Sequence, residues 1–308
     1  MNGDSAHRSC SWQETLPDGT VECSLCPRRC RIPPGSAGFC GVRFNRSGDL
    51  EPLGYGRVSA LALDPIEKKP LARFYPGSKI LSAGSWGCNL ECRFCQNHAI
   101  SREWIEAQED EGSAAPIIPG STRLSPGDLV SEALALQSRG NIGLAFTYNE
   151  PVVNFEYVRD SAILAREKGL QVVLVTNGYI NPEPLAEILP LVDAMNIDLK
   201  AFSDSFYRFI CRGALSPVKK TIEAVARSSP RCHLELTTLV IPGHNSDPEE
   251  IRALSAWVAS LGSGIPLHLN RHHPDWKMAA PGSIEAPALM ALADIARENL
   301  RYVYCGNI

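Results

Sequence analysis

Three cysteines with fixed spacing are the residues of this sequence best suited to carry out chemistry. Cys88, Cys92 and Cys95 form a C-x3-C-x2-C set directly after a short apolar run. A zinc site normally takes four protein ligands, whereas three thiolates can hold a [4Fe-4S] cluster whose fourth iron is left for another ligand. Two alternatives remain: a zinc site completed by His98, and a cluster that only transfers electrons.

An iron without a protein ligand gives such a cluster a further use. It can chelate the amino and carboxylate groups of S-adenosylmethionine (SAM), beside a reduced cluster able to donate one electron and split the S–C5′ bond. The product, a 5′-deoxyadenosyl radical, abstracts hydrogen from unactivated carbon. The triplet therefore predicts SAM chemistry, with its three cysteines as catalytic cluster ligands.

Motifs along the chain resemble those of a known family. An aromatic residue, Phe94, precedes the third cysteine of the triplet, as in the radical SAM superfamily. Within the superfamily the chain looks like the pyruvate formate-lyase activating-enzyme-like group, and most like the radical SAM component of the AmmeMemoRadiSam system. The motifs that carry the resemblance span nearly the whole chain: Cys-Ser-Leu-Cys-Pro-Arg-Arg-Cys at 23–30, Gly-Phe-Cys-Gly-Val-Arg at 38–43, Asp-Pro-Ile-Glu-Lys-Lys-Pro-Leu at 64–71, Cys-Gln-Asn at 95–97, His-His-Pro-Asp-Trp-Lys at 272–277 and the C-terminal Tyr-Cys-Gly-Asn-Ile.

The resemblance implies an enzyme that cleaves SAM reductively, with Phe94 among the residues around the cofactor. It implies an electron donor such as flavodoxin or ferredoxin. By similarity to activating enzymes, it also implies a protein or peptide substrate. Radical modification of a small molecule and a non-enzymatic iron-sulfur or zinc scaffold are the alternatives.

Four further cysteines lie close together near the N-terminus. Cys23, Cys26, Cys30 and Cys40 give a C-x2-C-x3-C-x9-C pattern that can close around one metal and order a segment lacking its own core. Four thiolates fill the site, so it is not a second SAM site. Zinc and a second [4Fe-4S] cluster both fit the spacing. The remaining cysteines are isolated and are expected to be buried thiols rather than ligands: Cys10, Cys211, Cys232 and Cys305.

Short apolar runs alternate with amphipathic segments from Ile80 onward, which predicts repeated βα units around a parallel sheet. Six strands are expected at 80–83, 143–147, 171–176, 194–198, 233–239 and 266–269, with a possible seventh at 301–304. Helices are expected at 125–138, 152–168, 184–189, 218–228, 248–261 and 286–298. The fold class is α/β, a partial (β/α)6 TIM-like barrel of the radical SAM type over residues 76–308, preceded by a small Cys-rich metal module over residues 1–75. Residues 106–123 are polar and aperiodic and are expected to form a mobile surface excursion.

In a parallel barrel, functional side chains lie at the C-terminal ends of the strands. After the second expected strand comes Thr-Tyr-Asn-Glu-Pro at 147–151, in the place of a Gly-Gly-Glu-Pro type motif in the related family. The resemblance implies that Asn149 and Glu150 contact the methionyl amino group of SAM. The alternative is an ordinary helix start with an acid in its first turn.

Three later strands also end in polar residues. Thr176 and Asn177 could bind the ribose or the methionyl carboxylate, although Asn-Gly is also a common turn. Asp198 and Lys200 share one face of their strand, and the resemblance implies that Lys200 pairs with the SAM carboxylate while Asp198 orients nearby donors. A surface ion pair is the alternative.

The sixth expected strand is followed by further polar residues. His268 and Arg271 are candidates for contacts with SAM or substrate, as is Asn270 between them. His272 and His273 are adjacent and point to opposite sides of an extended segment, so they are poorly placed to bind one metal ion together.

Charge and composition favour some partners over others. The 34 acidic residues against 30 basic residues give a net charge of −4, which offers no attraction for nucleic acid or an anionic membrane. No apolar run reaches membrane-spanning length, and charged residues interrupt the N-terminus where a signal peptide would be apolar, so we expect a cytoplasmic protein. Eleven cysteines in that compartment favour metal binding over disulfides.

Overall fold

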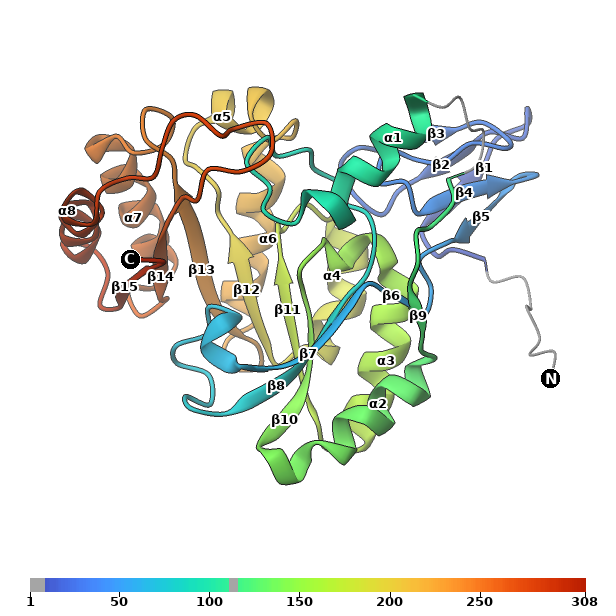
Figure 1. The fold of residues 1–308 in the computed structure, drawn as a ribbon, viewed down its shortest axis with the longest axis horizontal. Helices are drawn as coiled ribbons and strands as arrows, with labels where there is room; N and C mark the ends of the chain where they lie inside the picture. The colour runs from blue at the N-terminus through green and yellow to red at the C-terminus, as the bar shows by residue number, and fades with distance from the viewer. Residues whose placement is uncertain (1–8, 111–115) are drawn as a thin grey trace.

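An eight-stranded sheet forms the centre of the computed structural model, which describes residues 9–110 and 116–308. Seven neighbouring strands run parallel, and β7 is antiparallel to β8 at one edge. The strand order is β15-β14-β13-β12-β11-β10-β8-β7 (Figure 1). The strands are β7 (Ala60–Pro65), β8 (Lys79–Gly84), β10 (Asn141–Phe146), β11 (Gln171–Thr176), β12 (Ala194–Asp198), β13 (His233–Val240), β14 (Leu267–Arg271) and β15 (Val303–Gly306). All six expected strands and the possible seventh are confirmed.

Helices between the parallel strands pack against the sheet, as the alternating pattern predicts (Figure 1). The capping box of Ser125 and Asp128 begins the first of them, and the Asp247 side chain caps another. The covering helices are α2 (Pro126–Ala135), α3 (Phe155–Glu167), α4 (Pro182–Ile188), α6 (Leu215–Arg227), α7 (Pro248–Gly262) and α8 (Ala286–Arg297). The predicted α/β fold with a partial barrel is confirmed.

Some elements differ from the expectation. The excursion expected at 106–123 begins inside helix α1 (Trp104–Asp110), which follows a π-helical turn (Ala99–Glu103). Trp104 and Ile105 of α1 are buried against Cys40 and Val42. That expectation was therefore wrong for residues 106–110, while residues 111–115 lie outside the described residues. A short helix, α5 (Asp204–Phe209), was not anticipated. No helix within the described ranges is both long and apolar enough to cross a membrane.

The N-terminal region is built from small antiparallel pairings. Strands β1 (Gln13–Thr15), β2 (Val21–Cys23) and β3 (Arg31–Ile32) form one sheet, and β4 (Arg43–Arg46) pairs with β5 (Asp49–Pro52). A further pair joins β6 (Arg57–Val58) to β9 (Thr122–Arg123). The division of the chain at residue 75 stays a prediction, and β7 extends the central sheet.

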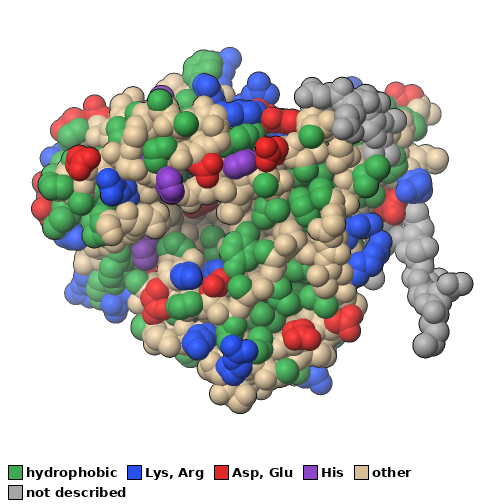
Figure 2. Space-filling view, viewed as in Figure 1, with side chains coloured by type: hydrophobic (Ala, Val, Ile, Leu, Met, Phe, Trp, Pro, Cys, Tyr) green, Lys and Arg blue, Asp and Glu red, His purple; other side chains and the backbone are tan. Residues whose placement is uncertain are grey.

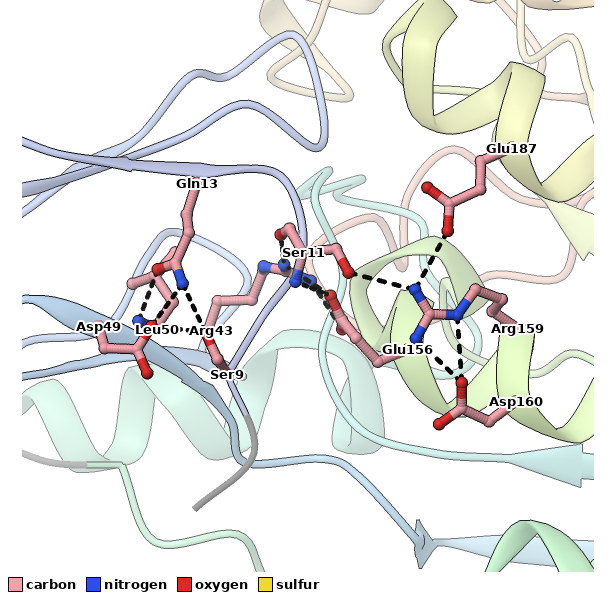
Figure 3. A network of polar contacts seen from close by, with 10 residues as sticks. All are labelled: Ser9, Ser11, Gln13, Arg43, Asp49, Leu50, Glu156, Arg159, Asp160 and Glu187. Atoms are coloured by element: carbon pink, nitrogen blue, oxygen red, sulfur yellow. Dashed lines mark hydrogen bonds and ion pairs between the residues drawn. The ribbon is translucent and has the colours of Figure 1, made fainter.

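A buried ion pair fastens the N-terminal strands to the barrel (Figure 3). The Arg43 guanidinium donates to both carboxylate oxygens of Glu156 on α3, at 3.1 and 3.0 Å. Each side chain is 2% exposed. The Ser11 backbone is bonded to both partners, because its N–H donates to Glu156 Oε1 and its carbonyl accepts from Arg43 Nη2. The two parts of the molecule therefore meet at a charged contact without access to water.

Residues 66–74, which we call the plug segment, pack against apolar side chains of the central sheet. Ile66, Leu71 and Phe74 pack there with apolar side chains of β8, β10, β11 and β12. Glu235 on β13 holds this plug segment, because its carboxylate accepts hydrogen bonds from the backbone N–H groups of residues 72 and 73. The imidazoles of His233 and His268 lie 2.9 and 2.6 Å from the same carboxylate.

Glu235 should make stability depend on pH. Burial opposes ionisation, but the two histidines and the two backbone amides outweigh it and lower the pKa of Glu235 to about 2. The stabilisation is thus present above the ordinary glutamate pKa and is lost as the pH falls toward 2. We expect Glu235→Gln to lower the free energy of unfolding by about 2 kcal/mol at pH 7 and by progressively less below pH ~4.5. Urea unfolding at several pH values measures this, with the exposed Glu132→Gln as control; an equal deficit at all pH values would contradict it.

Candidate active site

One cavity of about 320 Å³ lies at the C-terminal ends of the parallel strands. It is lined by the three cysteines of the triplet together with polar residues that follow β10, β11 and β12. Of the predicted cofactor-binding residues, the cavity contains these seven: Phe94, Asn149, Glu150, Thr176, Asn177, Asp198 and Lys200. The expectation that these side chains meet at one edge of the sheet therefore agrees with their placement.

Hydrogen bonds to sulfur surround the triplet. The backbone N–H of Leu90 and the side-chain amide of Asn177 lie 3.4 and 3.6 Å from Cys88 Sγ. Asn97 and Ser101 lower the pKa of Cys95 against the larger effect of burial. Donors of this kind stabilise thiolates and tune cluster potentials. The donor set thus fits the ligands of an iron-sulfur cluster.

Burial makes the free thiols of the triplet reluctant to ionise. It is the largest cause raising the pKa of Cys88 well above its usual value, and it raises that of Cys95 to about 11. A hydrogen bond with Cys211 is the largest cause raising the pKa of Cys92. Within the described residues no group of three or more His, Cys, Asp or Glu side chains is already arranged around one metal position. The ligand assignment therefore rests on the shared cavity and on the donors to sulfur.

Cys211 is a residue whose position sequence reasoning missed. It is completely buried and its thiol raises the pKa of Cys92, although Cys211 follows the triplet by more than a hundred residues. The segment that carries Cys211 also holds residues 85–95, which we call the triplet loop. The carbonyls of Cys211 and Ile210 accept hydrogen bonds from the N–H groups of Glu91 and Arg93 in this loop. Nothing in the local sequence around Cys211 indicates this contact.

Asn149 positions the triplet loop. Its side-chain oxygen accepts from the Ser85 N–H at 2.9 Å, and its side-chain nitrogen donates to the Gly87 carbonyl at 3.0 Å. Gly87 has φ +88°, and a Cβ there would stand 2.4 Å from the carbonyl oxygen of Cys40. Only glycine therefore allows the loop to lie against the N-terminal cysteine region.

Glu150 is a buried acid with three donors from the protein. Its carboxylate accepts from the Thr176 hydroxyl at 2.6 Å, the Asn177 N–H at 2.7 Å and the Val152 N–H at 3.0 Å. Burial nevertheless raises the pKa of Glu150 to about 7. Thr176 and Asn177 thus place this carboxylate beside Cys88, and its charge can respond to a bound cation.

Asp198 and Lys200 form an ion pair across the cavity wall. Lys200 Nζ lies 2.9 Å from Asp198 Oδ2 and 5.7 Å from the centre of the Phe94 ring. Burial favours the neutral amine, but the Asp198 carboxylate and Cys92 raise the pKa of Lys200 well above its usual value. Lys200 therefore remains a cation beside the triplet.

His268 and Arg271 do not line this cavity. The His268 imidazole is bonded to Glu235 and stacks on Tyr304, with ring centres 5.1 Å apart. Arg271 Nε donates to the Ile284 carbonyl at 2.7 Å. Their predicted contacts with SAM or substrate gain no support from this placement. Asn270, which lies between them, does line the cavity.

Comparison with known proteins agrees with this geometry. Residues 85–254 match the model of the radical SAM superfamily. The chain belongs to the radical SAM superfamily. As a member it is an enzyme, and the superfamily uses a [4Fe-4S] cluster and SAM. "Uncharacterized protein MJ0808" of Methanocaldococcus jannaschii is 39% identical over 98% of this chain and 85% of that protein.

Other relatives of this radical SAM enzyme are more distant. Pyruvate formate-lyase 1-activating enzyme of Escherichia coli is 20% identical over 61% of the chain and 71% of its own length, which confirms the resemblance to activating enzymes. Among solved structures, SuiB of Streptococcus suis aligns with TM-score 0.52 and 12% identity over 74% of this chain and 48% of that chain. TYW1 with a lysine-pyruvate adduct bound aligns with TM-score 0.51 and 16% identity over 78% and 83%. The two structures share the fold.

Proposed function

We propose that Cys88, Cys92 and Cys95 hold a [4Fe-4S] cluster at which SAM is cleaved reductively. The supporting observation is the single cavity that brings these thiols together with Glu150 and the Asp198–Lys200 pair. When bound, the cluster supplies the electron that splits the S–C5′ bond and so yields the 5′-deoxyadenosyl radical.

Two charged residues would hold the methionyl part of SAM. Glu150 would accept a hydrogen bond from the amino group, whose binding favours the ionised carboxylate. Lys200 would pair with the carboxylate, and Asp198 would keep the ammonium oriented. Three further residues are then positioning residues. The Asn149 side chain bonds to the triplet loop, that of Thr176 to Glu150, and that of Asn177 to Cys88.

Glu150→Gln tests the SAM site directly. A hydrogen bond to a charged group is worth about 1.5–3 kcal/mol, so we expect SAM affinity to fall roughly 10- to 100-fold. Titrating SAM into the reduced protein and following the electron paramagnetic resonance signal gives the affinity. Glu132→Gln is the matched control, and iron per chain is measured in both variants. An unchanged SAM titration midpoint in Glu150→Gln would count against the assignment.

A protein or peptide is the proposed target of the radical. The names of two relatives support it: the activating enzyme of pyruvate formate-lyase, and SuiB, whose structure has also been solved bound to the precursor peptide SuiA. A flavodoxin or ferredoxin is the proposed reductant. Incubating the reduced enzyme and SAM with candidate protein partners, and looking for a radical or a mass change on the partner, tests this target.

A small-molecule substrate is the second candidate. It is favoured by two residues of the cavity wall that the proposed SAM contacts do not use: the buried Lys69 and Tyr148, whose backbone has a positive φ. A non-enzymatic scaffold would differ from both candidates because it would not bind SAM, which the same titration detects. The assignment to the AmmeMemoRadiSam system likewise remains a prediction.

We also propose a metal centre at the N-terminal cysteine quartet. Cys23, Cys26, Cys30 and Cys40 line one small cavity together with Arg43. The backbone N–H groups of Arg28 and Val42 lower the pKa of Cys26 and Cys40, respectively, against the larger effect of burial. Arg43 Nε is buried, without a hydrogen-bond partner among the described residues, and its charge lies near Cys23. A thiolate of a metal centre would give this N–H an acceptor.

Zinc and a second [4Fe-4S] cluster both remain candidates for the quartet. Cys10 is buried close to Cys23 and Cys40, so five thiols gather in this region. Arg28 ties the region to the triplet loop and to the segment that follows Cys211, because its guanidinium donates to the carbonyls of Asn89 and Arg212. Quantifying iron and zinc in protein purified without oxygen, with and without Cys26→Ser, decides between the two metals.

A further inference from the structure

Part of the cavity wall takes no part in the proposed SAM site. Lys68, Lys69 and Pro70 line the cavity from the start of the plug segment, and Tyr148 lines it from the turn after β10. Lys68 and Lys69 belong to the Asp-Pro-Ile-Glu-Lys-Lys-Pro-Leu motif at 64–71, for which the sequence suggests no role. This wall therefore calls for its own explanation.

Lys69 is buried at the cavity, with 2% of the residue exposed. Its Nζ lies 2.8 Å from Asp64 Oδ2 and 4.7 Å from the centre of the Tyr148 ring. Buried lysines are uncommon, and an ion pair in the interior is often no more stabilising than apolar side chains of the same volume. Stability alone is therefore a weak reason for this ammonium group.

Tyr148 is held beside Lys69 at an energetic cost. Its φ of +71° lies in the left-handed region, which costs a residue with a bulky side chain about 1–3 kcal/mol. Its hydroxyl donates to Asp64 Oδ2 at 2.7 Å, the oxygen that also accepts from Lys69. Gly84 makes room for the ring, since a Cβ there would stand 2.8 Å from Tyr148 Cδ2. The Lys69 amine and the Tyr148 phenol thus both donate to Oδ2 of the Asp64 carboxylate.

Burial at the cavity favours the neutral form of Lys69 more than at an exposed lysine. Burial is the largest cause and lowers the pKa of Lys69, and the adjacent Lys68 cation lowers it further, against the opposing Asp64 carboxylate. A desolvated lysine beside a second cation is a recurring arrangement for amine nucleophiles. Lys68 itself is largely exposed, and its Nζ lies 4.0 Å from Asp64 Oδ1.

We propose that Lys69 is a nucleophile that forms an imine with the carbonyl carbon of a small anionic substrate, with Asp64 and Tyr148 moving the protons. Asp64 takes a proton from the ammonium, and the amine nitrogen adds to the carbonyl carbon. The carbonyl oxygen gains a proton from the Tyr148–Asp64 pair and, after a second proton transfer from nitrogen, leaves as water. The C=N bond replaces the C=O bond without any change in oxidation state. Lys68 supplies the cation that attracts the anionic group of the substrate.

This inference concerns the small-molecule candidate and rests on amine chemistry alone. Imine formation needs no SAM, no electron donor and no cluster, so it can be measured separately from SAM cleavage. A protein that releases 5′-deoxyadenosine without forming the imine would overturn the inference and leave the proposed function standing. A protein that forms the imine but releases no 5′-deoxyadenosine would overturn the proposed function and leave the inference standing.

Hydride trapping tests the proposal with glyoxylate, a carbonyl compound that carries a carboxylate. Full-length protein is incubated with limiting glyoxylate and sodium cyanoborohydride, which reduces an imine to a stable secondary amine, and each lysine is then quantified by peptide mass spectrometry. We expect Lys69 to be modified at least about tenfold faster than Lys68, because Asp64 and Tyr148 are placed to move protons for its amine. Modification of Lys68 and other exposed lysines with Lys69 unmodified would overturn the proposal.

Two variants show whether the neighbours of Lys69 act as proposed. Tyr148→Phe keeps the ring but removes the hydroxyl, and should slow labelling of Lys69 without changing that of Lys68. Lys68→Arg retains a cation, so Lys69 should still be labelled at a rate close to that of the wild type. Unchanged labelling of Lys69 in Tyr148→Phe would remove the phenol from the mechanism. Because the wild-type labelling is already resolved by site, the main result does not depend on the folding of either variant.

Discussion

Cys92→Ala is expected to abolish release of 5′-deoxyadenosine from SAM by anaerobically reconstituted and reduced protein. With two thiolates left in the loop, a cubane has too few protein ligands to stay bound with one iron free for SAM. Iron content should fall together with activity. Liquid chromatography of the quenched reaction measures the nucleoside, and colorimetric analysis measures the iron.

Two further cysteine variants make this result interpretable. Cys232→Ala also removes a buried thiol, directly before β13, and should keep both iron and activity. Cys211→Ala removes the thiol that raises the pKa of Cys92, and we expect the cluster to form because the triplet remains complete. Full turnover by Cys92→Ala would mean that Cys211 replaces the lost ligand or that the triplet does not hold the catalytic cluster.

Glu156→Gln and Arg43→Met are each expected to lower the free energy of unfolding by about 3–5 kcal/mol, the cost of leaving one charge of a buried pair without its partner. Arg43 and Glu156 have no access to water that could replace the lost contact. The double variant Arg43→Met, Glu156→Leu removes both charges and should recover most of the loss. Urea unfolding monitored by circular dichroism gives the three values.

An exposed contact in the same network serves as the control (Figure 3). Glu187 pairs with Arg159 at 3.1 Å, but its side chain is 36% exposed. Glu187→Gln should therefore change the free energy of unfolding by less than about 1 kcal/mol. Equal losses for Glu156→Gln and Glu187→Gln would show that the buried pair does not fasten the N-terminal strands to the barrel.

Much of the sheet could be predicted from the sequence, because the parallel strands are short apolar runs between amphipathic helices. β11 and β12 begin and end at the predicted residues. β7 was harder to assign, since its antiparallel pairing with β8 follows a Gly- and Pro-rich region and leaves most of its side chains partly exposed. Helix α1 was missed because its polar sequence is stabilised by Trp104 and Ile105 packing on the N-terminal region, a contact that no local pattern shows.

The candidate site was predictable in its members but not in their partners. Strand-end positions located Glu150, Asp198 and Lys200, because the ends of parallel strands meet. The sequence could not tell that the Thr176 hydroxyl would bond to Glu150 and the Asn177 side-chain amide to Cys88, since a polar side chain can take either a ligand or the protein as its partner. Lys69 and Tyr148 were missed as site residues because only tertiary structure brings the plug segment to the turn after β10.

Basic and acidic side chains are interspersed over the face drawn in Figure 2, in keeping with the small net charge. Partner recognition on this face would therefore depend on local shape and a few contacts more than on long-range attraction.

The close approach of Gly87 to the Cys40 carbonyl has a consequence for biosynthesis. The quartet leaves the ribosome before the triplet, so the metal that we propose for it would bind while the barrel is still incomplete. The loop that carries the triplet then closes against a surface that is already ordered, with Arg28 ready to bind the Asn89 carbonyl. Binding of the proposed quartet metal would thus come before the triplet loop closes against this surface.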